Sequence, residues 1–201
     1  KLADDGDATT QHDQAVYVVD PSDGKRRPFF NEMVFNTWFE NFDTVEEVTA
    51  EEMATYRLGA PVPVHHGTWL VKVQSAADVY AIERGGVLRR IASEDIAQQL
   101  WGPDWGSRVR DIPVTGFAHY AIGEDLESPV YPDDTIVRDE YLVTWHIRNG
   151  LRRQIRHEQL AWHGIREDLI LNNPVGLDLS LYGFGATYDL ADDFGWFDLS
   201  L

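Results

Sequence analysis

The stretch Val79–Gly123, VYAIERGGVLRRIASEDIAQQLWGPDWGSRVRDIPVTGFAHYAIG, decides the fold, because its landmarks occur in the same order before and after it. It contains an apolar strand-like segment, a glycine turn, a double arginine, a helix-like segment and a closing Tyr-x-apolar-Gly. Landmarks that recur in a fixed order at a constant period are typical of repeat proteins. The sequence therefore predicts that one building block occurs several times.

Three copies can be aligned on these landmarks. The helix-opening glutamates Glu32, Glu94 and Glu158 are 62 and 64 residues apart, and the closing tyrosines Tyr56, Tyr120 and Tyr182 are 64 and 62 residues apart. A double arginine follows each turn, at Arg26-Arg27, Arg89-Arg90 and Arg152-Arg153. Guanidinium groups favour bidentate pairing with carboxylates, so we expect these arginines to pair with acidic neighbours rather than to form a shared anion site.

Each copy combines strand patterns with helix patterns. In the first, Val16–Val19 and Arg26–Phe30 read as a hairpin, Asn31 as the cap of a helix, and Ala50–Tyr56 as a second short helix capped by Thr49. The predicted fold class is α+β: three tandem repeats, each a small antiparallel hairpin sheet with one helix and a short second helix. The predicted boundaries are 1–65 for repeat 1, which lacks its opening strand, 66–130 for repeat 2, 131–188 for repeat 3, and 189–201 for a tail.

The landmarks also carry a family resemblance. From Gly67-Thr68-Trp69-Leu70-Val71-Lys72 to Gly123, the chain resembles an uncharacterised repeat of exported and cell-wall-associated bacterial proteins, with the pattern G-x-L-[IV]-[KR], VYxV, a glycine turn, R-[RW]-I, a helix ending near tryptophan, and a closing Y-x-x-G. Repeat 3 departs furthest, since Trp145 replaces the tyrosine of VYxV. The resemblance implies an extracellular or cell-surface location and a repeat architecture, and it implies no activity.

Composition limits the classes of function. The 201 residues carry 34 acidic and 17 basic side chains, a formal charge of −17, which disfavours nucleic acid and anionic lipid as partners. The 43% of hydrophobic residues can fill a sizeable core, and the absence of cysteine excludes disulfides and thiolate chemistry. No apolar run is long enough to predict insertion into a membrane.

The C-terminal tail is a candidate interaction element. Gly195-Trp196-Phe197-Asp198-Leu199 follows Gly185 much as Gly67-Thr68-Trp69-Leu70-Val71 follows Gly59, so it resembles the opening strand of a fourth repeat. An unpaired apolar strand tends to associate with a sheet edge. We expect the tail to complete repeat 1, either of its own chain or of a neighbouring chain, and therefore expect partners to include the protein itself or another surface protein.

Sites for metals and catalysis are weakly indicated. Asp4, Asp5, Asp7 and Asp13 form a candidate calcium site, although they depart from the EF-hand pattern and also suit a solvated acidic loop. His157 and His163 are six residues apart and so lie on different helix faces, which argues against a zinc hydrolase. His65-His66 is expected to be exposed to solvent. No catalytic or other cofactor-binding residue is predicted, so we expect a protein that is not an enzyme.

The tryptophans offer a second kind of interaction surface. Trp38, Trp101 and Trp105 fall on apolar stripes and are expected in the core. Aromatic side chains at a surface can stack on sugar rings or on a protein partner. The candidate interaction residues are Trp196, Phe197, Leu199, Trp69, Trp145 and Trp162.

Together these patterns favour a non-catalytic extracellular repeat protein. Its expected role is structural or interactive at the bacterial cell surface, with self-assembly through the C-terminal strand as one form of that role. A module that binds cell-wall polysaccharide is the first alternative, and a hydrolase without a recognisable motif is the second.

Overall fold

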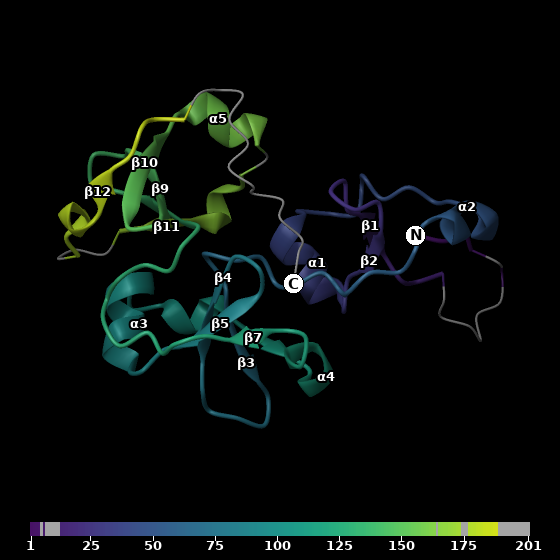
Figure 1. Cartoon of the computed structure of the whole chain (residues 1–201), viewed down its shortest axis with the longest axis horizontal. Helices are drawn as coiled ribbons and strands as arrows, with labels where there is room; N and C mark the ends of the chain where they lie inside the picture. Colours follow the sequence, from purple (N-terminus) through teal and green to yellow (C-terminus); the bar gives the residue numbers. More distant parts are fainter. Residues whose placement is uncertain (5, 7–12, 164, 174–176, 189–201) are drawn as a thin grey trace. The chain divides into compact units, whose positions relative to one another are not determined.

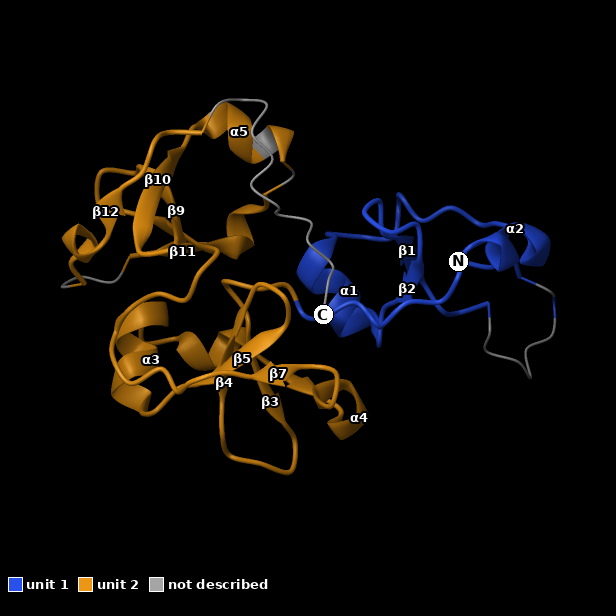
Figure 2. Ribbon diagram, in the orientation of Figure 1, with its two compact units in different colours: residues 1–64, 199–201 blue, residues 65–198 orange. Residues whose placement is uncertain are grey.

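The chain folds into two compact bodies (Figure 2). The computed structural model describes residues 1–4, 6, 13–163, 165–173 and 177–188. Residues 1–64 form the N-terminal body, and the described residues from 65 onward form the C-terminal body. Repeat 1, repeat 2 and repeat 3 are used below only as labels for residues 1–65, 66–130 and 131–188, and their descent from one building block remains a prediction. The predicted boundary at residue 130 falls inside the C-terminal body, because repeats 2 and 3 share one hydrophobic core.

The N-terminal body contains a hairpin and two capped helices. Its elements are β1 (Tyr17–Val19), β2 (Arg26–Pro28), α1 (Glu32–Trp38) and α2 (Ala50–Thr55). The Asn31 side chain accepts a hydrogen bond from the Val34 amide at 3.0 Å, and Thr49 Oγ1 accepts one from the Glu52 amide at 3.2 Å. These caps satisfy amides that have no partner within the helix. Both helices therefore begin at the residues that the sequence predicts.

The C-terminal body contains two sheets with helices between their strands (Figure 1). Repeat 2 comprises β3 (Leu70–Val73), β4 (Tyr80–Glu83), β5 (Val87–Arg90), α3 (Glu94–Trp101), η1 (Trp105–Arg108), β6 (Val109–Ile112), α4 (Val114–Phe117) and β7 (Ala121–Ile122). Repeat 3 comprises β8 (Thr135–Arg138), β9 (Thr144–Arg148), β10 (Leu151–Ile155), α5 (His157–Trp162), η2 (Glu167–Leu169), β11 (Ile170–Asn172), η3 (Leu179–Leu181) and β12 (Gly183–Phe184). None of the helices in the described ranges has the length and apolarity to cross a membrane.

Both five-stranded sheets have the same strand order. One runs β6-β3-β4-β5-β7 and the other β11-β8-β9-β10-β12. The three inner strands are antiparallel, whereas each outer strand is parallel to its neighbour. The prediction of purely antiparallel hairpin sheets is therefore wrong. The outer strands are only two to four residues long, and their partners lie far away in sequence, so no local pattern indicated them.

One hydrophobic core joins repeats 2 and 3. Buried members from repeat 2 include Leu70, Leu100 and Trp101, and buried members from repeat 3 include Val137 and Leu171. The Tyr131 amide also donates a hydrogen bond to the Tyr182 hydroxyl inside this core. Because neither sheet buries its inner face alone, the two repeats fold as one body rather than as separate domains.

The closing glycine of each repeat has a structural role. The amides of Gly59, Gly123 and Gly185 donate hydrogen bonds to the carbonyl groups of Arg26, Leu88 and Arg152 at 2.9, 2.9 and 3.0 Å. A Cβ at Gly59 would lie 3.2 Å from Cγ of Arg27, and one at Gly185 would lie 2.5 Å from Cγ of Arg153. The missing side chain therefore lets an arginine stem cross the closing segment.

Strand register corrects the alignment of the double arginines. Val18, Ala81 and His146 pair with Arg27, Arg89 and Arg153, so these three arginines occupy equivalent positions. Arg27 forms an ion pair with Asp20 at 2.8 Å and Arg89 forms one with Glu83 at 3.1 Å, as predicted for carboxylate partners. In repeat 3 the residue at that acidic position is Arg148, and Arg153 instead lies over the Tyr188 ring at 5.4 Å.

Gly67→Ala is expected to destabilise the C-terminal body by about 3 kcal/mol, because the backbone has a φ of 84° and a new Cβ would overlap the Asp134 carbonyl oxygen. Gly85→Ala is the matched control, since its φ is 72° but nothing lies within 4 Å of the new Cβ, and it should cost about 1 kcal/mol. Urea unfolding of both variants measures the difference. Equal losses would contradict a close contact at Gly67.

Candidate functional site

A buried polar network lies where repeats 2 and 3 meet. Its centre is Asp134, which is buried, precedes β8 and has a positive φ of 66°. Arg84, in the turn after β4, donates from Nε to Asp134 Oδ2 at 2.8 Å and from a terminal nitrogen to Oδ1 at 3.1 Å. This bidentate pair links the β4–β5 turn of repeat 2 to the opening strand of repeat 3.

His146 and Tyr188 extend the network. His146 on β9 is fully buried and lies with Nε2 2.9 Å from Asp134 Oδ1 and Nδ1 2.7 Å from the Tyr188 hydroxyl. A carboxylate accepts hydrogen bonds, so Nε2 donates to Asp134, and Nδ1 shares a hydrogen bond with the Tyr188 hydroxyl. Gln159 on α5 in turn donates to the Tyr188 carbonyl at 3.0 Å. The network therefore connects β8, β9, α5 and the segment that follows β12.

The charge at Asp134 is stabilised by its partners. Burial alone raises the pKa of Asp134, but hydrogen bonds from His146 and Arg84 outweigh burial and hold the pKa well below its usual range. The carboxylate is therefore ionised at neutral pH. Asp134, His146 and Tyr188 are all buried, so a substrate cannot reach them. The network is suited to fixing the joint between repeats rather than to catalysis.

The paired histidines are buried, contrary to the sequence prediction. His65 and His66 stack with ring centres 4.8 Å apart, and His65 Nδ1 lies 2.9 Å from the His66 carbonyl oxygen. Burial, followed by the neighbouring His66, lowers the pKa of His65 well below its ordinary value of 6.5. The prediction failed because composition around Pro61 and Pro63 indicated a linker, whereas residues 62–71 are continuously buried.

The described ranges contain no group of three His, Cys, Asp or Glu side chains placed to bind a metal ion. Of the candidate calcium ligands, Asp4 accepts a hydrogen bond from the Gly6 amide at 2.7 Å, and Asp13 is half-buried. Asp5 and Asp7 lie outside the described residues, so the calcium prediction remains a prediction.

The predicted interaction aromatics have different surroundings. Trp69 is buried beneath the Arg110 guanidinium, whose carbon is 4.0 Å from the ring centre, so its prediction as a surface contact is wrong. The reason is that residues on both sides of Trp69 enter the core. Trp145 is half-buried on β9, and Trp162 is exposed on α5. Trp196, Phe197 and Leu199 lie outside the described residues.

The structure also reveals an exposed apolar position that the sequence analysis used only as a landmark. Leu58, Ile122 and Phe184 precede the closing glycines and are 62%, 60% and 72% exposed. Their strand partners are Arg26, Leu88 and Arg152, in that order. The carbonyl groups of these partners accept the hydrogen bonds from the closing glycines. The sequence signal for this position was an apolar residue at the same place in three copies. That signal did not reveal exposure, because an apolar residue gives the same local pattern in the core and at the surface.

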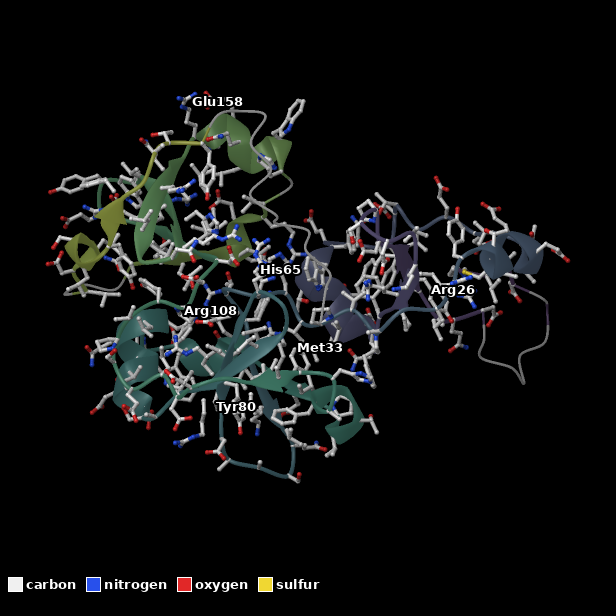
Figure 3. The ribbon with its side chains drawn as sticks, viewed as in Figure 1. Arg26, Met33, His65, Tyr80, Arg108 and Glu158 are labelled. Carbon is white, nitrogen blue, oxygen red and sulfur yellow. The ribbon has the colours of Figure 1, made fainter. Side chains whose placement is uncertain are left out.

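Aromatic and basic side chains adjoin this exposed position. In repeat 3, Arg152 lies over the Trp145 ring at 5.2 Å and over the Phe184 ring at 4.1 Å. In repeat 1, Arg26 lies over the Tyr17 ring at 5.3 Å (Arg26 is labelled in Figure 3). In repeat 2, Leu88 replaces the arginine, and Tyr80 packs edge-on against Phe117. In repeats 1 and 3 a cation and an aromatic ring therefore adjoin the exposed apolar residue, whereas in repeat 2 its strand partner Leu88 is fully buried.

Stability is expected to decrease as the pH falls below about 6.5, because the unfolded chain protonates His65 there while the folded chain keeps it neutral. The groups that act on His65 are His66, Arg166 and Asp134. His65→Gln should lower the melting temperature at pH 8 but flatten its decline towards pH 5, and the exposed His119→Gln is the control. A decline that is equally steep in His65→Gln would exclude His65 as its source.

Comparisons with known proteins leave the chain without an assigned family. No protein-family model matches it, and no curated protein matches it. Among solved structures, it is similar to a chain of the periplasmic assembly from the ESX-5 inner membrane complex, with a TM-score of 0.24 and 14% identity over 90% of this chain and 65% of that chain. A chain of an intact ESX-5 inner membrane complex gives a TM-score of 0.24 and 13% identity over 92% and 54%. This chain thus spans less than two thirds of either, and superposition at this level does not identify a shared fold.

Proposed function

We propose that the chain is a non-catalytic protein of three tandem repeats with a structural or interaction role at the bacterial cell surface. The observation that carries the interaction role is the apolar residue exposed at the same sheet position in every repeat, at Leu58, Ile122 and Phe184. Exposed apolar side chains cost solvation free energy, so a position that repeats them three times is better explained by binding than by folding.

Three further features support the repeat interpretation. The two five-stranded sheets have the same strand order, and the closing-glycine hydrogen bond occurs in all three copies. Helices α1 and α3 are also capped alike, since the side chains of Asn31 and Ser93 each accept a hydrogen bond from the amide three residues later. The cell-surface location rests on the sequence resemblance to exported, wall-associated repeats. The most chemically elaborate cluster, around Asp134, is buried, which favours architecture over catalysis.

The combined variant Leu58→Ser, Ile122→Ser, Phe184→Ser tests the proposed interaction face. We expect the wild-type mass to rise with concentration in sedimentation velocity and the variant to remain a single chain. Surface substitutions of this kind change stability by about 0.5 kcal/mol or less each, so folding should be retained. Val114→Ser with Leu142→Ser is the control, because both residues are exposed elsewhere. Wild-type protein that stays a single chain and also fails to sediment with purified cell walls would contradict the proposal.

A second candidate function is the binding of wall polysaccharide, favoured by the Trp145–Arg152–Phe184 cluster. Sugar rings stack on aromatic faces, and Arg152 Nε has no hydrogen-bond acceptor among the described residues. An acidic polysaccharide offers both a sugar face and a carboxylate.

Polygalacturonate, with dextran as the neutral control, serves as the probe for this second function. Tryptophan fluorescence should change in a saturable way with polygalacturonate, and Arg152→Gln should weaken binding about tenfold, since it removes a charge-assisted hydrogen bond. Arg57→Gln, at an exposed basic residue, is the matched control. Equal responses to both polysaccharides, or equal effects of the two variants, would contradict a site at Arg152.

A further inference from the structure

Two arginines of the C-terminal body lie half-buried without an ion-pair partner of their own. Arg108 ends η1 and Arg110 follows on β6 (Arg108 is labelled in Figure 3). Among the described residues, their hydrogen bonds go to backbone carbonyl groups. Arg108 donates to the Asp168 carbonyl at 3.1 Å, and Arg110 donates to the carbonyls of Ser107 and Val109 at 2.8 and 3.2 Å. A half-buried cation without a carboxylate lacks the partner that usually offsets its loss of water.

A third arginine takes up the nearest carboxylate. Arg166 donates from Nε and from a terminal nitrogen to the two carboxylate oxygens of Asp168 at 2.9 and 2.8 Å. Burial lowers the pKa of both Arg108 and Arg110, and Asp168 is the described carboxylate that opposes the shift. The charge of Arg110 also lowers the pKa of Arg108, so these two guanidinium groups lie close together. Three guanidinium groups therefore share one carboxylate, which leaves two positive charges here in a chain with a formal charge of −17.

The acidic residues next to this cluster in sequence have other partners. Asp111 follows Arg110 on β6 and therefore points to the opposite sheet face, where it lies 3.5 Å from Lys72 Nζ. Glu167 forms a bidentate pair with Arg138, at 2.8 and 3.0 Å. The excess of positive charge is therefore not removed by the neighbouring carboxylates.

Arg110 is also held in place by the fold. Its guanidinium carbon lies 4.0 Å from the ring centre of Trp69, which is buried. The neighbouring Thr68 hydroxyl donates a hydrogen bond to the Leu169 carbonyl, and Arg110 itself pairs with Val71 in the parallel register of β6 and β3. A cation fixed in advance loses little conformational entropy when a ligand binds to it.

A polar groove of about 710 Å³ includes Arg108 in its lining. Its walls come from the exposed face of α3, from residues 102–104 and from the end of β11. Trp101 also lines the groove, is 6% exposed, and has an indole Nε1 without a hydrogen-bond acceptor among the described residues. The uncharged and acidic polar side chains along the groove include Asp95, Gln98, Gln99, Asp104 and Asn172. The volume is in the range of sites for small molecules.

We propose that Arg108 and Arg110 bind the phosphate group of a phosphorylated sugar, whose hydroxyl groups lie in the groove beside α3. A phosphate monoester carries about two negative charges at pH 7 and offers three acceptor oxygens, which match the two unbalanced positive charges and the guanidinium donors. Side-chain amides both donate to and accept from hydroxyl groups, and the carboxylates of Asp95 and Asp104 accept from them. This site shares no residue with the exposed apolar position or with the Arg152 cluster, so it goes beyond the proposed function.

Isothermal titration calorimetry with glucose 6-phosphate, inorganic phosphate and glucose tests the site. At physiological ionic strength we expect saturable binding of glucose 6-phosphate and about tenfold weaker binding of inorganic phosphate, because the free anion makes no contact in the groove. Glucose should not bind, since it lacks the charge. Glucose 6-phosphate that binds no more tightly than inorganic phosphate would overturn the role of the groove, and the absence of saturable binding by both phosphates would overturn the arginine site.

Variants separate the two halves of the site. Arg108→Gln should weaken binding of glucose 6-phosphate about tenfold, since it removes a charge-assisted hydrogen bond. Arg156→Gln, at an exposed arginine of the same body, is the matched control for the loss of one charge. The double variant Gln98→Ala, Gln99→Ala should weaken glucose 6-phosphate about fivefold and leave inorganic phosphate unchanged, and alanine favours the helix, so α3 should be retained. Equal losses in Arg108→Gln and Arg156→Gln would show non-specific attraction and overturn the proposal.

Discussion

The opening strand of each five-stranded sheet, β3 or β8, is the element on which the rest of that sheet depends. Strands β3 and β8 pair along both edges and bury consecutive side chains on both faces, so each holds together a hairpin on one side and an outer parallel strand on the other. In the N-terminal body, a cavity adjoins β1 and residues 45–48. Val19 on β1 is 42% exposed, whereas Ile82, at the same register on β4, is 1% exposed.

The polar network at Asp134 joins repeats 2 and 3. A buried carboxylate is costly unless it is hydrogen-bonded, and Arg84 and His146 supply those bonds from two different sheets. Arg84 lies in repeat 2 and His146 in repeat 3, so the carboxylate of Asp134 holds side chains from both repeats together. The clustering of Arg84, Asp134 and His146 therefore joins residues 66–130 to residues 131–188.

The surface has an organisation of its own. Apolar residues that adjoin the closing glycines are exposed in all three repeats, and in repeats 1 and 3 an arginine stacked on an aromatic ring lies beside them. A fold with enough hydrophobic residues to fill its core has no packing reason to place them there. These exposed residues are the feature that our proposal of an interaction role explains.

The sequence by itself determined the local elements, namely the hairpins, the caps at Asn31, Thr49 and Ser93, and the α+β class, because these depend on residues close together in the chain. It also identified the closing glycines. Only the tertiary structure decided that the outer strands are parallel, that repeats 2 and 3 share a core, that His65 and His66 are buried, and that Leu58, Ile122 and Phe184 are exposed. These properties arise from contacts between residues distant in sequence, and an apolar residue has the same local pattern whether a distant segment covers it or not.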